Sequence, residues 1–220
     1  KNTSVYEYRK KLGAQLAEES HVETDLIVPV PDSGVPAAIG YSEKIKKNVE
    51  LGIVRNHYVG RTFIEPSQQI RSLGVKLKHS INKTLIKNKS LILIDDSLVR
   101  GTTSVKIIKM LYDFGAKEVH LRIASPPIKF PDYYGVDTPT KKELLAANYD
   151  IEGMRKFINV KTLRFLSIEG LYKSMGCQNR NSYYPQFTDH CFTGDYPVKP
   201  LDADNENIDK NQLSYMSSKS

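Results

Sequence analysis

Residues 91–104, LILIDDSLVRGTTS, hold the side chains of this sequence that are best suited to chemistry. The apolar run 91–94 predicts a buried strand, and two adjacent carboxylates, Asp95 and Asp96, stand directly after it. A turn rich in Gly, Ser and Thr then opens a predicted helix, where free backbone N–H groups and hydroxyls can hold a phosphate monoester. The residues expected to contact that phosphate are Ser97, Arg100, Gly101, Thr102, Thr103 and Ser104.

Two carboxylates beside a phosphate site repel an anionic ligand unless sugar hydroxyls or a shared Mg²⁺ engage them. A phosphorylated ribose satisfies both parts of the motif, because its phosphate suits the Gly-, Ser- and Thr-rich turn and its hydroxyls suit the two carboxylates. A turn with a helix cap explains less, because a cap needs one Asp and not two. A receiver domain would place a third Asp and a Lys after later strands, where this chain has Ser125-Pro126-Pro127, and no P-loop Gly-Lys-Ser/Thr follows a strand.

The elements that must position this motif alternate between short apolar runs and amphipathic stretches. Strands are predicted at 26–30, 49–54, 91–94, 119–124 and 163–167, and helices at 4–19, 35–47, 102–114, 141–147 and 151–157. Strand–helix–strand units at this spacing predict an α/β fold, a doubly wound and mainly parallel sheet flanked by helices. In such a sheet ligands bind beyond the carboxyl ends of the strands, where Asp95 and Asp96 stand.

Two further segments can contribute to the same edge of the sheet. The sequence Pro-Asp-Ser-Gly at 31–34 follows the first predicted strand, although it also suits an ordinary turn. Residues 55–80 lack clear periodicity and are too long for a simple connection, so they suit either a lid over an anionic substrate or a solvated basic loop. The residues of interest in this stretch are Arg55, His57, Tyr58, Arg61, Gln69, Arg71, Lys76, Lys78 and His79.

The motif at 91–104 resembles the phosphoribosyl pyrophosphate signature of type I phosphoribosyltransferases. Three more segments, PVPDSGVP at 29–36, RNHYVGRTFI at 55–64 and ASPP at 124–127, together resemble the amidophosphoribosyltransferase family. These glutamine-dependent enzymes open purine biosynthesis, and the similarity runs from about residue 4 to residue 197. The resemblance implies that ammonia displaces pyrophosphate from phosphoribosyl pyrophosphate, which gives 5-phosphoribosylamine.

The resemblance also implies roles for particular residues. Residues 31–35, with Asp32, Ser33 and Gly34, correspond to the loop that holds the pyrophosphate, and Ser33 would reach the Mg²⁺ that Asp95 and Asp96 approach from the other side. Residues 55–80 correspond to the family's flexible lid. Arg55 and Arg61 would act catalytically with the paired carboxylates, by stabilising charge on the leaving group.

Three features depart from the family's pattern. Residues 1–25 contain no counterpart of the nucleophilic Cys of its N-terminal glutaminase domain, so this chain alone is expected to use ammonia. Some members hold an iron–sulfur cluster on four cysteines; Asp132 stands where they often place one, and only Cys191 matches in the C-terminal region, so no cluster is expected. Feedback sites in the family lie partly at subunit contacts, which leaves regulation open, while a homo-oligomer is expected.

Composition and charge limit the class of protein and the kinds of partner that this sequence can represent. The chain has 220 residues, 40% of them hydrophobic, and shows neither a membrane-length apolar run nor a signal peptide, which predicts a cytoplasmic globular protein without a membrane partner. Its net charge of +7 is spread without a long basic block, which favours a small anion over nucleic acid. We divide the chain into a helical segment (1–24), a phosphoribosyltransferase domain (25–170), a C-terminal extension (171–200) and a disordered tail (201–220).

Two other functions fit the same sugar-phosphate motif. A salvage phosphoribosyltransferase would need a hood that stacks on a base, for which Tyr133, Tyr134 and Tyr149 are the candidates, although core or surface packing is the simpler explanation of them. A non-enzymatic sensor would keep the phosphoribosyl pyrophosphate site and add a DNA-binding module. No helix-turn-helix pattern flanks the motif in this sequence.

Overall fold

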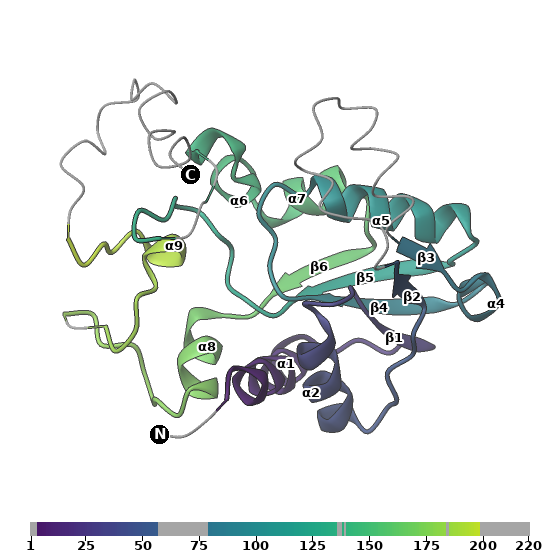
Figure 1. The fold of residues 1–220 in the computed structure, drawn as a ribbon, viewed down its shortest axis with the longest axis horizontal. Coiled ribbons are helices and arrows are strands. Elements are labelled where there is room, and N and C mark those ends of the chain that lie inside the picture. The colour runs from purple at the N-terminus through teal and green to yellow at the C-terminus, as the bar shows by residue number, and fades with distance from the viewer. Residues whose placement is uncertain (1–3, 57–78, 136–137, 139, 184, 199–220) are drawn as a thin grey trace, which may run out of the picture.

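The centre of the molecule is a four-stranded parallel sheet in the order β1-β4-β5-β6. The computed structural model describes residues 4–56, 79–135, 138, 140–183 and 185–198 (Figure 1). The strands are β1 (Leu26–Pro29), β4 (Ser90–Asp95), β5 (Glu118–Ile123) and β6 (Thr162–Phe165). Their neighbours are joined in parallel register, with Leu26 opposite Leu91 and Leu91 opposite Val119. Four of the five predicted strands are therefore confirmed as the central sheet.

Helices cover both faces of this sheet (Figure 1). On one face lie α1 (Val5–Ser20), α2 (Val35–Ile45) and α8 (Ile168–Ser174), and on the other lie α5 (Thr102–Asp113), η2 (Lys141–Glu143), α6 (Leu145–Asn148) and α7 (Ile151–Ile158). Successive side chains of β4 point to opposite faces of the sheet. Ile92 and Ile94 therefore pack in the core beneath α1 and α2, and Leu91 and Leu93 pack in the core beneath α5. The predicted doubly wound α/β fold is confirmed.

Helices α1 and α2 approach each other unusually closely through two glycines. A Cβ atom added at Gly13 would lie 1.8 Å from the Ala37 carbonyl oxygen, and one added at Gly40 would lie 1.8 Å from that of Lys10. Ser4 caps α1, since its Oγ accepts a hydrogen bond from the Glu7 N–H at 3.2 Å. This close packing fixes the position of α2, and with it the turn that joins β1 to α2.

The predicted strand at 49–54 is wrong in its extent and in its sheet. The structure has β2 (Ile53–Arg55), which pairs antiparallel with β3 (His79–Ile81) in a separate two-stranded sheet, followed by α4 (Lys83–Ile86). Val49 makes only an isolated parallel bridge to Ile27. The apolar run is interrupted because Leu51 is 63% exposed and the chain turns at Gly52, whose N–H donates to the Glu50 carbonyl.

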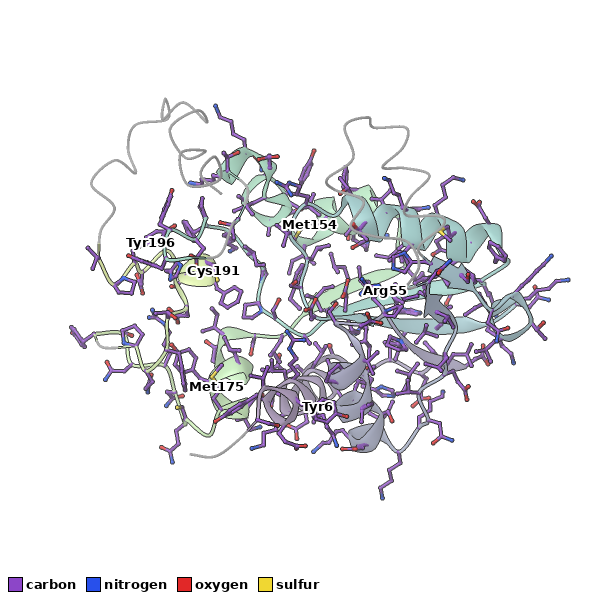
Figure 2. All side chains as sticks on the ribbon, in the orientation of Figure 1. Tyr6, Arg55, Met154, Met175, Cys191 and Tyr196 are labelled. Carbon is purple, nitrogen blue, oxygen red and sulfur yellow. The ribbon has the colours of Figure 1, made fainter. Side chains whose placement is uncertain are left out.

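The C-terminal region is held by a polar cluster that the sequence did not predict. Asp189, only 2% exposed, accepts hydrogen bonds from Tyr172 Oη at 2.9 Å and from Arg180 Nε at 2.5 Å. In the short helix α9 (His190–Thr193), His190 Nε2 lies 2.8 Å from Asp132 Oδ2. Figure 2 shows that Cys191 and Tyr196 of this region lie at the end of the molecule remote from Arg55.

Part of the sequence predictions falls outside the described residues, including the tail 201–220 and residues 1–3. Among the helices that the structure does describe, none is long and apolar enough to cross a bilayer. The cytoplasmic location stays a prediction.

Candidate active site

A polar cleft of about 290 Å³ opens at the carboxyl ends of the adjacent strands β1 and β4. Two loops meet there: the β1–α2 turn (residues 30–34) and the β4–α5 loop (residues 96–101). The cleft is lined by Val30, Pro31, Asp32, Ser33, Arg55, His79, Asp95, Asp96 and Thr103. Ligand-binding clefts of open α/β sheets are expected at this edge.

The β1–α2 turn is pressed against strand β4. The Val30 N–H donates to the Ile94 carbonyl at 2.8 Å, and the Gly34 N–H donates back to the Val30 carbonyl at 3.0 Å. A Cβ atom at Gly34 would lie 2.4 Å from the Ile94 carbonyl oxygen. Glycine is therefore required here by close approach of two backbones, and this approach brings Ser33 to the paired carboxylates.

Asp95 and Asp96 share a small hydrogen-bond network. Asp95 Oδ1 accepts from the Asp96 N–H at 2.9 Å, and Ser97 Oγ donates to Asp96 Oδ1 at 3.2 Å, while Ser33 lines the cleft with the two carboxylates. Burial, together with the neighbouring charge of Asp96, raises the pKa of Asp95 to about 8. A cation or sugar hydroxyls beside the pair would relieve this repulsion.

The N-terminus of α5 forms the other wall of the cleft. Its N-cap is Gly101, whose φ of 73° is left-handed and which has no side chain to cap the first N–H groups of the helix. Thr103, in the first turn, lines the cleft, while Ser104 is buried. The helix therefore presents its positive end to the cleft, which suits a phosphate group.

Arg55 and His79 stand at the third side of the cleft, on β2 and β3. They are directly opposite each other in the antiparallel pair, so their side chains project to the same face. Arg55 Nη1 forms an ion pair with Asp32 Oδ2, and its Nε is buried without a hydrogen-bond partner among the described residues. Figure 2 shows Arg55 at β2, beside the central sheet. An anionic ligand in the cleft would give this guanidinium a second partner.

Most of the site residues that were predicted from the sequence, and that the structure describes, lie in or beside the cleft. Asp32, Ser33, Arg55, Asp95, Asp96 and Thr103 line the cleft, and Gly34, Ser97, Gly101, Thr102 and Ser104 belong to the loops or the helix turn that form it. Arg100 does not line it, because its Nε faces Glu143 Oε1 at 3.4 Å. The predicted lid residues His57, Tyr58, Arg61, Gln69, Arg71, Lys76 and Lys78 lie outside the described residues.

The sequence predicts His79 as part of the lid and gives it no separate place in the binding site. It is 6% exposed, and the pairing of β3 with β2 carries it into the cleft. The three-residue run His79–Ile81 is too short and too polar to predict a strand, so no local signal could have found this position.

Comparison with known proteins identifies the class. Residues 4–125 match the model of the phosphoribosyl transferase domain, and the chain belongs to that family. The particular relatives are amidophosphoribosyltransferases. The protein of that name from Rhizobium etli is 56% identical over 216 residues, which are 98% of this chain and 43% of the relative. Chloroplastic amidophosphoribosyltransferase 1 of Arabidopsis thaliana is 51% identical over 200 residues, 91% of this chain and 34% of the relative.

Solved structures give the same result. Glutamine phosphoribosylpyrophosphate amidotransferase from Bacillus subtilis, complexed with ADP and GMP, matches with a TM-score of 0.78 at 48% identity, over 89% of this chain and 43% of that one. The predicted resemblance to amidophosphoribosyltransferases is thereby confirmed. The chain spans less than half the length of these relatives.

Proposed function

We propose that this chain transfers ammonia nitrogen to phosphoribosyl pyrophosphate with loss of pyrophosphate, which gives 5-phosphoribosylamine and begins purine biosynthesis. The observation that carries the proposal is the meeting of three groups in one cleft: the β1–α2 turn, the paired carboxylates and the N-terminus of α5. The names of the relatives support the choice of this reaction within the family.

Each part of the cleft suits one part of the substrate. The N-terminus of α5 with Thr102 and Thr103 would hold the 5′-phosphate, and Asp95 and Asp96 would accept hydrogen bonds from the ribose hydroxyls. The β1–α2 turn and Arg55 would hold the pyrophosphate. Because the three groups are fixed on strands and a helix, the reacting carbon would be held in place for attack.

The oxygen-bearing side chains of the cleft also fit Mg²⁺. In the described part of the chain no three His, Cys, Asp or Glu side chains are grouped to hold a metal by themselves. Mg²⁺ commonly uses one or two carboxylates and completes its shell with water and substrate phosphates, which matches Asp95, Asp96 and the Ser33 hydroxyl. When bound, it would neutralise charge on the pyrophosphate and on the paired carboxylates.

The displacement needs little acid–base chemistry from the protein. As the bond to pyrophosphate loosens, positive charge develops on the ribose ring, near Asp95 and Asp96, and negative charge develops on the leaving group, near Arg55. Ammonia attacks the ring carbon with its lone pair and then loses a proton to solvent. We further propose that a glutaminase domain outside this chain supplies the ammonia and that the protein works as a homo-oligomer.

Pyrophosphate release tests the proposal. The 220-residue chain would be incubated with phosphoribosyl pyrophosphate and Mg²⁺, with either ammonium or glutamine as the nitrogen source. We expect release with ammonium and not with glutamine, lost in the Asp95→Asn/Asp96→Asn variant. The matched control is Asp113→Asn, because this Asp lies on α5 with its side chain 56% exposed and pairs with Lys109 outside the cleft.

Other outcomes would point to the alternative functions. Release that depends on an added purine or pyrimidine would indicate a salvage enzyme, and Mg²⁺-dependent binding without any release would indicate a sensor. The tyrosines considered for a base hood do not line the cleft: Tyr133 and Tyr134 pack near Tyr196, and Tyr149 stacks on Phe157.

A further inference from the structure

The β4–α5 loop (residues 96–101) is braced from outside the cleft by the segment 140–148, which contains η2 and α6. The Leu145 N–H donates a hydrogen bond to the Val99 carbonyl at 2.8 Å, and Glu143 Oε1 lies 3.4 Å from Arg100 Nε. A Cβ atom at Gly101 would lie 2.8 Å from Leu145 Cδ2. Three consecutive residues of the loop therefore meet this segment.

The bracing segment is held together by its own hydrogen bonds. Thr140 and Glu143 form a capping box, and Asn148 Nδ2 donates to the carbonyls of Lys141, Lys142 and Leu144 at 2.7 to 3.2 Å. Leu144 is fully buried, and Leu145 is 5% exposed within the core beneath α5. The Leu145 contacts with the loop are thus anchored in the core, whereas Glu143 and Arg100 pair at the surface, where their side chains are 40% and 52% exposed.

These contacts decide which backbone groups the loop offers to a ligand. A phosphate cradle needs N–H groups directed into the cleft and carbonyl groups directed away from it. The bond from Leu145 turns the Val99 carbonyl to the outside, and Leu145 packs where Gly101 begins α5. The Glu143 pair likewise keeps Arg100 on the outer side.

We propose that Leu145 and Glu143 are positioning residues for the 5′-phosphate loop and set the affinity of the site for the phosphate end of its substrate. The inference rests on the proposed function, because it assumes that a sugar phosphate occupies the cleft. It places a determinant of affinity in residues that never touch the ligand.

Two variants test the brace, each with a matched control. Leu145→Ala removes the side chain beneath Gly101, and its control is Leu171→Ala, because Leu171 is similarly buried at 8% exposed but lies on the opposite face of the sheet. Glu143→Gln removes the charge while its amide oxygen can still accept the capping-box bonds. Its control is Glu152→Gln, which breaks an ion pair on α7 with Arg155.

Binding of ribose 5-phosphate and of Mg²⁺-pyrophosphate would be measured separately by calorimetry, together with KM for phosphoribosyl pyrophosphate and kcat for pyrophosphate release. We expect Leu145→Ala to weaken ribose 5-phosphate binding and to raise KM for phosphoribosyl pyrophosphate, each by about tenfold. Glu143→Gln should change the same two quantities by about threefold. In both variants kcat and the affinity for Mg²⁺-pyrophosphate should stay within about twofold of the wild-type values. Both controls should leave the two affinities unchanged.

Equal weakening of both ligands by Leu145→Ala, or the same loss in Leu171→Ala, would overturn the inference, because either would indicate general loss of structure. Unchanged ribose 5-phosphate binding in both test variants would also overturn it. Wild-type protein that binds neither ligand would refute the proposed function itself, and the positioning role with it.

Discussion

At the scale of single residues, the cleft combines excess negative charge with one incompletely paired cation. Asp32, Asp95 and Asp96 line it, and among the described residues Arg55 is the only Arg or Lys that does so. Its Nη1 contacts Asp32, while its buried Nε has no partner in the described part of the chain. A buried donor without an acceptor costs about 1 to 3 kcal/mol, so a ligand oxygen placed there would be bound favourably.

We predict that Arg55→Lys lowers kcat for pyrophosphate release by about tenfold, because Lys keeps the charge but loses the planar, multidentate guanidinium. The measurement is the initial rate with ammonium at saturating phosphoribosyl pyrophosphate. Arg155→Lys is the matched control, since the two side chains are 31% and 30% exposed and Arg155 pairs with Glu152 on α7. Equal rates in wild type and Arg55→Lys would remove Arg55 from the catalytic groups.

At the scale of elements, the site depends on how closely the β1–α2 turn lies against β4. The position of the turn is constrained, because α2 follows it at once and is packed on α1 through Gly13 and Gly40. Any atom added at the contact between Gly34 and the Ile94 carbonyl must displace one backbone or the other.

Gly34→Ala should therefore lower the free energy of unfolding by about 2 kcal/mol and abolish most pyrophosphate release. Urea unfolding and the ammonium-dependent assay would measure the two effects. In Gly153→Ala, the comparison variant, the nearest atom to the new Cβ is the Asp150 carboxylate oxygen at 3.0 Å, at the end of a side chain. A normal activity in Gly34→Ala would contradict the proposed role of the close contact.

The elements also show what could be predicted from the sequence. Strands β1, β4 and β5 and helix α5 could be predicted because their buried residues form apolar runs or a regular apolar pattern in the sequence. Asp95 and Asp96 could be predicted as site residues because they stand at the end of one such strand. Residues such as His79 and Glu143 reach the site or its loop through pairing and packing with distant segments. Such contacts leave no local pattern, so His79, the brace and the antiparallel β2–β3 pair could not be foreseen.

At the scale of the whole molecule, the edge pairing of β5 and β6 includes a buried histidine. His120 is 5% exposed, and its Nδ1 lies 2.9 Å from Thr162 Oγ1. Burial, reinforced by the nearby positive charge of Arg122, lowers the pKa of His120 from its ordinary 6.5, although Glu118 acts in the opposite sense.

We predict that the free energy of unfolding falls between pH 7.5 and pH 5.5 because of His120, whose pKa is lowered in the folded chain. The unfolded chain takes up the proton near pH 6.5 and the folded chain only at lower pH, so acid favours unfolding in this window. Urea titrations at several pH values would measure the loss, and His120→Gln should make it smaller. An identical pH dependence in the variant would assign the loss to other groups.

The pairing of β1 with β4 has a consequence for how binding ability arises during folding. Leu26 meets Leu91, so the two loops of the cleft come from strands that are far apart in the chain and meet only when a long intervening loop closes. Until that step the chain holds two halves of a site and can bind with neither. A ligand that contacts both loops can bind only after β1 and β4 have paired, which is after the rate-limiting step of folding. It would therefore slow unfolding and leave the rate of folding unchanged.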